Sequence, residues 1–306
     1  MRLQVALAFL LLLSAPARAE TVHEAVDAYA LYQGDVSALL DMDIDSAAAL
    51  DGALERASRH DPARAARGWI AYGALTAAQS PRFAAGVQSR VRAASRAAVL
   101  RQLRRDLTYA RRRPPGSAEA IQLILNSVAA DSARMAAAGH RFEGVGDALD
   151  ASTWVISERG AREARLRRTD GAGIPAEWTA RLHVGALAAA PLTDPYAFGG
   201  QRFWDGLARR EPPPPSAIAW RERSGRAGAT DRMLTLAALV IVAAADSESA
   251  RVDAVLDDPR ARECLALEQL QFRQCASVTH DPNEDAFCLA RHGLIAPSAC
   301  FGALVQ

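Results

Sequence analysis

The stretch that decides the fold is residues 258–300, which read DPRARECLALEQLQFRQCASVTHDPNEDAFCLARHGLIAPSAC and hold every cysteine of the chain. From Cys264 to Cys275 there is no glycine or proline, and good helix formers predominate, which predicts a helix. The sequence 281–284, Asp-Pro-Asn-Glu, combines a capping aspartate, a proline suited to the first helical turn and the glutamate of a capping box. It predicts a second helix, which we expect to end near Gly293, because Pro297 hinders its continuation.

The cysteine spacing also predicts how the cysteines pair. An eleven-residue helical separation places Cys264 and Cys275 roughly 16 Å apart along the axis, whereas a disulfide needs Cα atoms within about 7 Å. These two therefore cannot bond each other, and an antiparallel hairpin nests its bridges. We predict Cys275–Cys288 as the inner bridge and Cys264–Cys300 as the outer one. A metal site and reactive thiols are the rival interpretations, but no C-x2-C pair supports zinc.

This pattern resembles, with wider spacing, the twin-cysteine helical hairpins of mitochondrial C-x9-C proteins. It is more similar to the C-terminal ends of uncharacterised exported bacterial all-helical proteins, which carry a CL…QC…EDAFCL…H…C pattern. The resemblance covers roughly residues 263–300. It extends to the helical region around residues 68–72, which reads Gly-Trp-Ile-Ala-Tyr. It implies a related fold and no function.

The N-terminus is typical of a secretory signal peptide. Arg2 precedes a nine-residue apolar core, and Ala17-Arg18-Ala19 forms an A-x-A cleavage site, so residues 1–19 are expected to be removed. We expect a periplasmic or secreted protein, in agreement with paired cysteines. After cleavage we expect no transmembrane segment, because the apolar run 233–245 is too short to span a bilayer.

Composition limits the class of partner only weakly. The chain of 306 residues has 36 basic and 35 acidic residues, and every basic residue is arginine. This near-neutral balance gives no global preference for nucleic acid or membrane.

Strand patterns are nearly absent, so we predict an all-α fold: a multi-helix bundle or irregular helical array closed by the disulfide-stapled hairpin at 258–306. Residues 20–306 are expected to form a single domain. Helices are predicted at 22–40 with a break at Gly34, 47–59, 62–79, 81–108 with a bend near Val99, 117–138, 141–168 after an interruption at Gly139, 175–189, 233–245 and 248–256. Because the run 233–245 is so apolar, it is expected to be the central core helix, beside the hairpin.

The segment 190–229 is the least regular, with many prolines and a concentration of aromatic residues. We interpret it as a strap over the helices, since clustered aromatics argue against disorder. If the protein has a ligand groove, we expect it under this strap, at Tyr196, Phe198, Phe203 and Trp204. The favoured alternative is that these side chains only anchor the strap to the core.

Residues 82–113 contain ten arginines and a single acid, Asp106. They predict a basic surface for an anionic partner. The alternative is a solvated face whose charges pair with acids elsewhere, which the near-neutral balance favours. The candidate surface residues are Arg90, Arg101, Arg104, Arg105, Arg111, Arg112 and Arg113.

No pattern fixes a metal site. The sequence 41–45, Asp-Met-Asp-Ile-Asp, has the spacing of half an EF-hand loop, but Ser46 and Gly52 stand where such a loop needs glycine and glutamate. We therefore expect Asp45 or Ser46 to cap the next helix. The pairs His140 with Glu143 and His23 with Asp27 lack a third ligand, so we expect neither metal nor cofactor.

The sequence favours an exported, non-catalytic binding or scaffolding protein whose partner is an anionic envelope component or another protein, and not a nucleic acid. One alternative is a hydrolase acting on envelope material. The sequence lacks the hydrolase motifs G-x-S-x-G and H-E-x-x-H, so its site would have to be made of carboxylates that folding brings together. The available carboxylates include Asp194, Asp205, Glu143 and Glu158. Another is a small-molecule carrier with an apolar cavity beneath the strap.

Overall fold

A computed structural model of the chain describes residues 20–149, 152, 154–155 and 220–305. Within these ranges the protein is all-α, as the sequence predicts, and the extended pairing consists of an isolated bridge between Glu222 and Val305. The helices are α1 (Val22–Asp41), α2 (Ala47–Ser58), α3 (Pro62–Ala78), α4 (Pro81–Ala94), α5 (Arg96–Arg105), α6 (Tyr109–Arg112), α7 (Ser117–Leu149), α14 (Ala227–Ile241), α15 (Ser249–Leu256), α16 (Pro259–Val278), α17 (Pro282–Cys288) and α18 (Ala296–Phe301).

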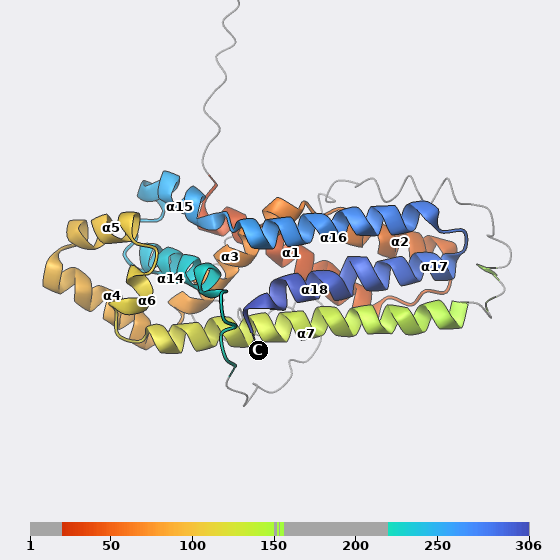
Figure 1. Cartoon of the computed structure of the whole chain (residues 1–306), viewed down its shortest axis with the longest axis horizontal. Helices are drawn as coiled ribbons and strands as arrows, with labels where there is room; N and C mark the ends of the chain where they lie inside the picture. Colours follow the sequence, from red (N-terminus) through yellow and green to blue (C-terminus); the bar gives the residue numbers. More distant parts are fainter. Residues whose placement is uncertain (1–19, 150–151, 153, 156–219, 306) are drawn as a thin grey trace, which may run out of the picture.

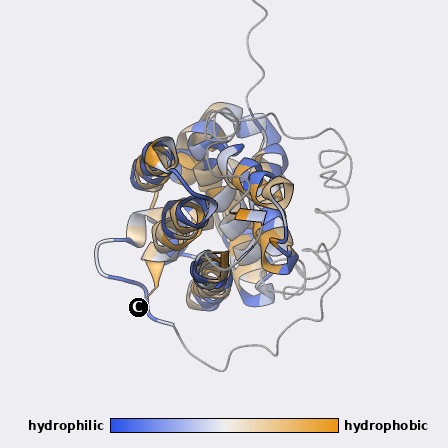
Figure 2. Ribbon diagram, turned by 90° about the vertical axis from the view of Figure 1, so that its right-hand side faces the viewer, coloured by the Kyte–Doolittle hydropathy of each residue, from blue (hydrophilic) through white to orange (hydrophobic). Residues whose placement is uncertain are grey.

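The helices form an elongated bundle (Figure 1). The long helices α7 and α16 run along its length, and α17 and α18 lie between them. The short helices α4, α5 and α6 gather at one end, next to α14 and α15. Figure 2 views the bundle along its long axis and shows the helices packed around a shared interior. The molecule therefore has two different ends, which we call the hairpin end (the tip of α16 and α17 with the end of α7) and the arginine end (α4, α5 and α6).

Helix α3 is the centre of the core, because it packs against α1, α7, α14 and α16. Two glycines allow its closest contacts. A Cβ on Gly68 would lie 2.6 Å from the carbonyl oxygen of Ala25 in α1, and a Cβ on Gly73 would lie 2.3 Å from Sδ of Met233 in α14. Trp69 is fully buried between these neighbours.

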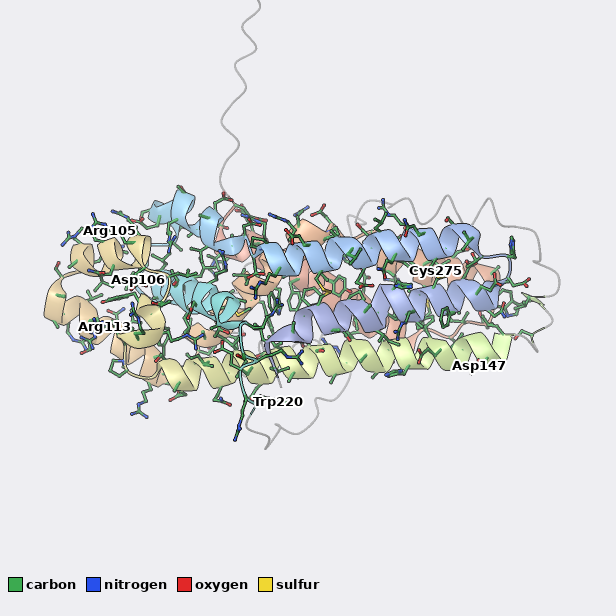
Figure 3. All side chains as sticks on the ribbon, in the orientation of Figure 1. Arg105, Asp106, Arg113, Asp147, Trp220 and Cys275 are labelled. Atoms are coloured by element: carbon green, nitrogen blue, oxygen red, sulfur yellow. A yellow bond between two sulfur atoms is a disulfide. The ribbon has the colours of Figure 1, made fainter. Side chains whose placement is uncertain are left out.

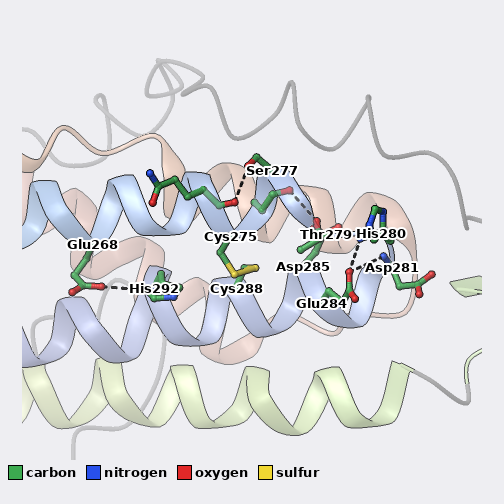
Figure 4. Close-up of a disulfide and its surroundings, with 12 residues drawn as sticks. Glu268, Cys275, Ser277, Thr279, His280, Asp281, Glu284, Asp285, Cys288 and His292 are labelled. Atoms are coloured by element: carbon green, nitrogen blue, oxygen red, sulfur yellow. Dashed lines mark hydrogen bonds and ion pairs between the residues drawn. A yellow bond between two sulfur atoms is a disulfide. The ribbon is translucent and has the colours of Figure 1, made fainter.

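The hairpin end is held by the nested disulfides. Cys264 bonds Cys300 with Cα atoms 5.8 Å apart, and Cys275 bonds Cys288 with Cα atoms 5.6 Å apart. These are the pairs that the spacing predicts. At the tip, Asp281 and Glu284 form the expected capping box, as Figure 4 shows beside the inner bridge. The hairpin is thus fixed by covalent bonds and by its own turn.

Several predicted helix breaks are wrong. Gly34 lies buried inside α1, and α7 continues through Gly139 as 33 residues. The hairpin's second helix does not end at Gly293 or stop before Pro297. Instead it continues as a π-helical segment, Leu289–Ile295, into α18. Glycine weakens a helix by about 1 kcal/mol, and packing against neighbours outweighs that weakness here. Gly139, for example, faces Ile295 of the π segment.

The predicted central helix at 233–245 is also displaced. Helix α14 covers Ala227–Ile241, so residues 227–229 belong to it and not to a strap. Its residues from Met233 to Leu239 are buried as expected, but it packs mainly on α3 and lies beside the arginine end. The hairpin closes the core against α3 and α7 instead.

One helix in the described part, Pro282–Leu304, is long and apolar enough to cross a membrane by length and composition alone. In this structure 56% of its most apolar window is buried inside the protein. The buried part packs against α7 and α16.

Candidate functional site

The arginine end begins with a sharp bend at Ser95. This residue adopts φ 73°, a conformation that residues with a side chain rarely take, and it separates α4 from α5. Its hydroxyl accepts a hydrogen bond from the backbone N–H of Ala98 at 3.3 Å, so it also caps α5. The predicted bend near Val99 of a single helix 81–108 is therefore placed four residues too late, and a further break separates α5 from α6.

The turn between α6 and α7 is pressed onto α4 through two glycines. A Cβ on Gly86 would lie 2.2 Å from the carbonyl oxygen of Pro115, and Gly116, at φ 88°, comes as close to the backbone of α4. Arg90 adds to the contact, because its Nε and Nη2 donate to the carbonyl oxygen of Arg113 at 3.0 and 2.7 Å. Helix α4 thus fixes the backbone position of Arg113 through Gly86 and the side chain of Arg90.

Between α4, α5 and α6 lies a groove of about 350 Å³. We call it the arginine groove, and its lining residues are Arg90, Ala94, Ala98, Val99, Arg101, Gln102, Asp106, Tyr109 and Arg113. Figure 3 labels Asp106 and Arg113 at this end of the molecule. The groove brings together arginines from three separate helices or turns, which gives it a net positive charge.

Three of the seven predicted surface arginines are instead paired inside the fold. Arg111 binds Asp231 through Nε and binds Glu222 at 2.9 Å. Arg104 binds Glu248, and Arg112 binds Asp106 at 2.6 Å. Arg104 and Arg111 hold α5 and α6 to the segments 246–248 and 222–231, whereas Arg112 pairs within the arginine end. The expected alternative of internally paired charges therefore applies to part of the surface.

The remaining predicted arginines behave differently. Arg101, Arg105 and Arg113 are exposed, and none has an ion pair within the described part of the chain. Arg101 and Arg113 line the groove with Arg90, while Arg105 lies on α5 outside it. A guanidinium is planar and presents donors in a fork that fits carboxylate and phosphate oxygens. The arginine groove therefore has the donors and the charge that bind an anion.

The acids nearest the groove remain charged. A hydrogen bond from the Thr108 hydroxyl lowers the pKa of Asp106, and Arg112 lowers it further. The bond from Arg104 lowers the pKa of Glu248. Asp106 is thus an ionised carboxylate engaged with Thr108 and Arg112, and it offsets only part of the positive charge of the groove.

Burial acts strongly on the pKa of two acids away from this end, Asp35 and Asp27. Asp35 is 1% exposed and contacts Arg56, Arg59 and His60, with His60 Nε2 2.7 Å from its carboxylate. Burial alone would raise the pKa of Asp35, but its bonds to His60 and Arg59 hold that pKa below the usual value. A buried ion cluster of this kind is structural, and it joins α1 to α2.

Asp27 is the other unusual carboxyl. Burial raises the pKa of Asp27 to about 7, with the charge of Glu24 adding to the rise and Arg64 opposing it. One of its oxygens is buried without a hydrogen-bond partner among the described residues. The protonation of this carboxyl therefore changes near neutral pH.

The other candidate residues from the sequence do not lie in the arginine groove. His140 Nδ1 lies 2.8 Å from Glu143 on the exposed face of α7, and Ser46 caps α2 by accepting from the N–H of Ala49. Across the described ranges, no three histidine, cysteine or acidic side chains form a group that would hold a metal ion. The groove candidates Tyr196, Phe198, Phe203 and Trp204, and the carboxylates Glu158, Asp194 and Asp205, lie outside the described residues.

Sequence reasoning missed Gln102 and Tyr109, which complete the groove wall. It also missed a second hollow, of about 550 Å³, at the hairpin end. Neither has a local signal, because both depend on how helices distant in sequence meet. No protein-family model, curated protein or solved structure matches this chain.

Proposed function

We propose that this chain is an exported, non-catalytic binding protein that holds an anionic group in the arginine groove. The observation that carries the proposal is the contrast among the arginines of one region. Arg104, Arg111 and Arg112 are matched to acids, whereas Arg101 and Arg113 converge with Arg90 on one hollow without such a match in the described part.

Export is part of the proposal. The two disulfides indicate an oxidising, extracellular environment. The signal-like residues 1–19, with cleavage near Ala19, support secretion or release into the periplasm. The ligand we infer is therefore an anionic component of the cell envelope that carries phosphate or carboxylate groups.

The shape of the groove favours a specific anion-binding site over a surface that attracts anions only by its overall positive charge. Its arginines lie on separate elements fixed by Ser95, Gly86 and Gly116, so the backbone positions that carry the donors are set before a ligand arrives. Preorganised donors bind more tightly because less conformational entropy is lost on binding. A groove open to solvent also suits a group carried on a larger molecule.

The carrier hypothesis has less support. Among the described residues, the apolar pocket between α1, α3 and the hairpin, lined partly by Tyr32 and Phe272, has a volume of about 30 Å³. This is room for a water molecule and not for a lipid-sized ligand. Of the four carboxylates named for a hydrolase, Glu143 is the described one, and it pairs with His140.

The test is a calorimetric titration of the mature protein with pyrophosphate and, separately, with citrate, which distinguish phosphate from carboxylate recognition. We expect Arg101→Gln and Arg113→Gln each to weaken binding of the preferred anion by about ten-fold, since each removes a charged donor. Arg113→Gln keeps the backbone carbonyl that anchors Arg90, so the groove should retain its shape.

Arg105→Gln is the matched control, because it removes the same charge from α5 outside the groove. It should change affinity by less than about three-fold. Equal losses in all three variants would mean that the anion senses only the general charge of this end. An absence of binding to either anion would contradict the proposal.

A further inference from the structure

The hollow at the hairpin end is a preformed groove with apolar walls and acidic charges. Its volume is about 550 Å³, and it lies between the end of α7 and the tip of α16 and α17. We call it the acidic groove, and its lining residues are Glu143, Gly146, Asp147, Cys275, Val278, Thr279, Asn283, Glu284, Phe287 and Cys288. Every charged residue in this lining is an acid.

Two large apolar side chains of this groove face solvent. Val278 is 65% exposed and Phe287 is 54% exposed. They flank the Cys275–Cys288 bridge, and the Asp281 capping box fixes the turn between them. Apolar side chains held on a rigid, covalently closed turn form a surface that binds a partner at low entropic cost.

The acids of the groove are not equally available. Glu284 accepts from the backbone N–H of Asp281, so it serves the turn, and Glu143 pairs with His140. Asp147 is exposed and has no ion pair among the described residues. It therefore offers the least compensated negative charge at this end, where Figure 3 labels it.

The same chain carries a surface of opposite charge at its other end. Arg101 and Arg113 line the arginine groove, together with the small or aromatic contacts Ala94, Ala98 and Tyr109. Figure 3 shows Arg113 and Asp147 near opposite ends of the long axis. The two grooves cannot meet within one molecule, but they can meet between two.

We propose that the acidic groove of one molecule docks on the arginine groove of a second copy, so that molecules associate head to tail. The inference rests on the proposed function, because it uses the same arginine groove and names the carboxylates of a second copy as its anionic group. Two different surfaces that pair in this way make a heterologous contact, which builds open chains unless its rotation closes a ring. The charge pairing makes assembly faster and sensitive to salt.

The first measurement is sedimentation velocity of the mature protein across a range of concentrations. In about 50 mM salt we expect the mass to rise with concentration beyond that of a dimer, and in about 500 mM salt we expect it to fall toward the monomer. Pyrophosphate should lower the mass as well, since it occupies the arginine groove.

Two variants then block one groove each. Phe287→Ser removes the apolar contact of the acidic groove, and the double variant Arg101→Glu with Arg113→Glu reverses the charge of the arginine groove. Each alone should weaken association by about ten-fold or more. Mixed in equal amounts they should form a dimer and nothing larger, because only one intact pair of grooves remains.

Leu270→Ser is the matched control, because Leu270 is 52% exposed on α16 and lies outside the acidic groove. It should leave association unchanged. Equal weakening by Leu270→Ser and Phe287→Ser, or a mixture of the blocked variants that stays monomeric, would overturn the proposed interface.

A wild-type protein that stays monomeric in low salt would overturn the inference outright. If pyrophosphate or citrate still bound and Arg113→Gln still weakened that binding, the proposed function would stand without it. A monomer that bound a synthetic arginine- and leucine-rich peptide through Phe287 would assign the acidic groove to another protein instead.

Discussion

Short helices are held in place by different interactions at the hairpin end and at the arginine end. The hairpin is closed by two disulfides, the inner one near its tip at the hairpin end and the outer one at its base, and both join α16 to the helices that return beside it. At the arginine end there is no cysteine, and ion pairs from Arg104 and Arg111 tie α5 and α6 to distant segments. Covalent bonds are indifferent to salt, whereas exposed ion pairs are screened by it. The two ends should therefore respond to different perturbations.

The largest effect should come from breaking the disulfides. The outer bridge closes a loop with a separation of 36 residues and the inner one a loop of 13. The chain-entropy relation gives losses of about 4 kcal/mol for Cys264→Ser with Cys300→Ser and about 3 kcal/mol for Cys275→Ser with Cys288→Ser. Urea unfolding followed by circular dichroism measures both free energies.

Hydrogen exchange locates the change. Amides of α17 should exchange faster in either double variant, while those of α4 should keep their protection under native conditions. Equal loss of protection at both ends would show that the bundle opens as one unit and that the distinction between the ends is wrong.

The second largest loss of stability should come from Arg111 at the arginine end, which pairs with two acids. The side chain of Arg111 is 24% exposed, and Arg111→Met leaves Glu222 and Asp231 without their partner. We expect a loss of about 2 to 3 kcal/mol in the free energy of unfolding, because partly buried carboxylates remain uncompensated. Thermal and urea unfolding in low salt provide the measurement.

Arg104→Met is the comparison for this variant. Arg104 is 53% exposed and its ion pair is screened by solvent, so its loss should cost clearly less free energy of unfolding than the loss of Arg111. Adding Glu222→Gln and Asp231→Asn to Arg111→Met should recover part of the stability. If no stability returned, the ion pairs would not be what holds α6.

The smallest effect uses one matched pair of glycines, one at each end. Gly86→Ala places a methyl group 2.2 Å from the backbone oxygen of Pro115, which cannot move without displacing the turn, so we expect a loss of about 1 to 3 kcal/mol. Gly139→Ala places a methyl group 2.4 Å from Cγ1 of Ile295 and 3.1 Å from the backbone oxygen of Ala290. The side chain of Ile295 must shift, but the gain in helix propensity, about 1 kcal/mol, offsets part of that cost. The shift in urea midpoint should be clearly larger for Gly86→Ala.

Helix starts could be predicted from sequence because their signals are local. Asp61, Ser80 and Asp258 each precede a proline, and each accepts a hydrogen bond from a backbone N–H three residues later. The nested disulfides followed from the same kind of geometry within one hairpin. Helix ends were less predictable, since Gly34, Gly139 and Gly293 continue in helices that packing holds together.

The candidate site was only half predictable for the same reason. The arginines of 82–113 were identified, but their acidic partners lie more than 100 residues further along the chain, at Glu222, Asp231 and Glu248. No local pattern distinguishes Arg104, which pairs with Glu248, from Arg101, which has no ion pair among the described residues. The bend at Ser95, which creates the groove, has no signal of its own in the sequence.

Because the two bridges are nested, a proteolytic cut within the hairpin does not separate the chain into two molecules. Any single cut of the chain between Cys264 and Cys300 leaves both fragments joined by at least the outer bridge. A cut at the tip, near His280, leaves them joined by two. Exposed turns are where proteases cut first, so a molecule nicked at this turn keeps its parts together and continues as a two-chain protein.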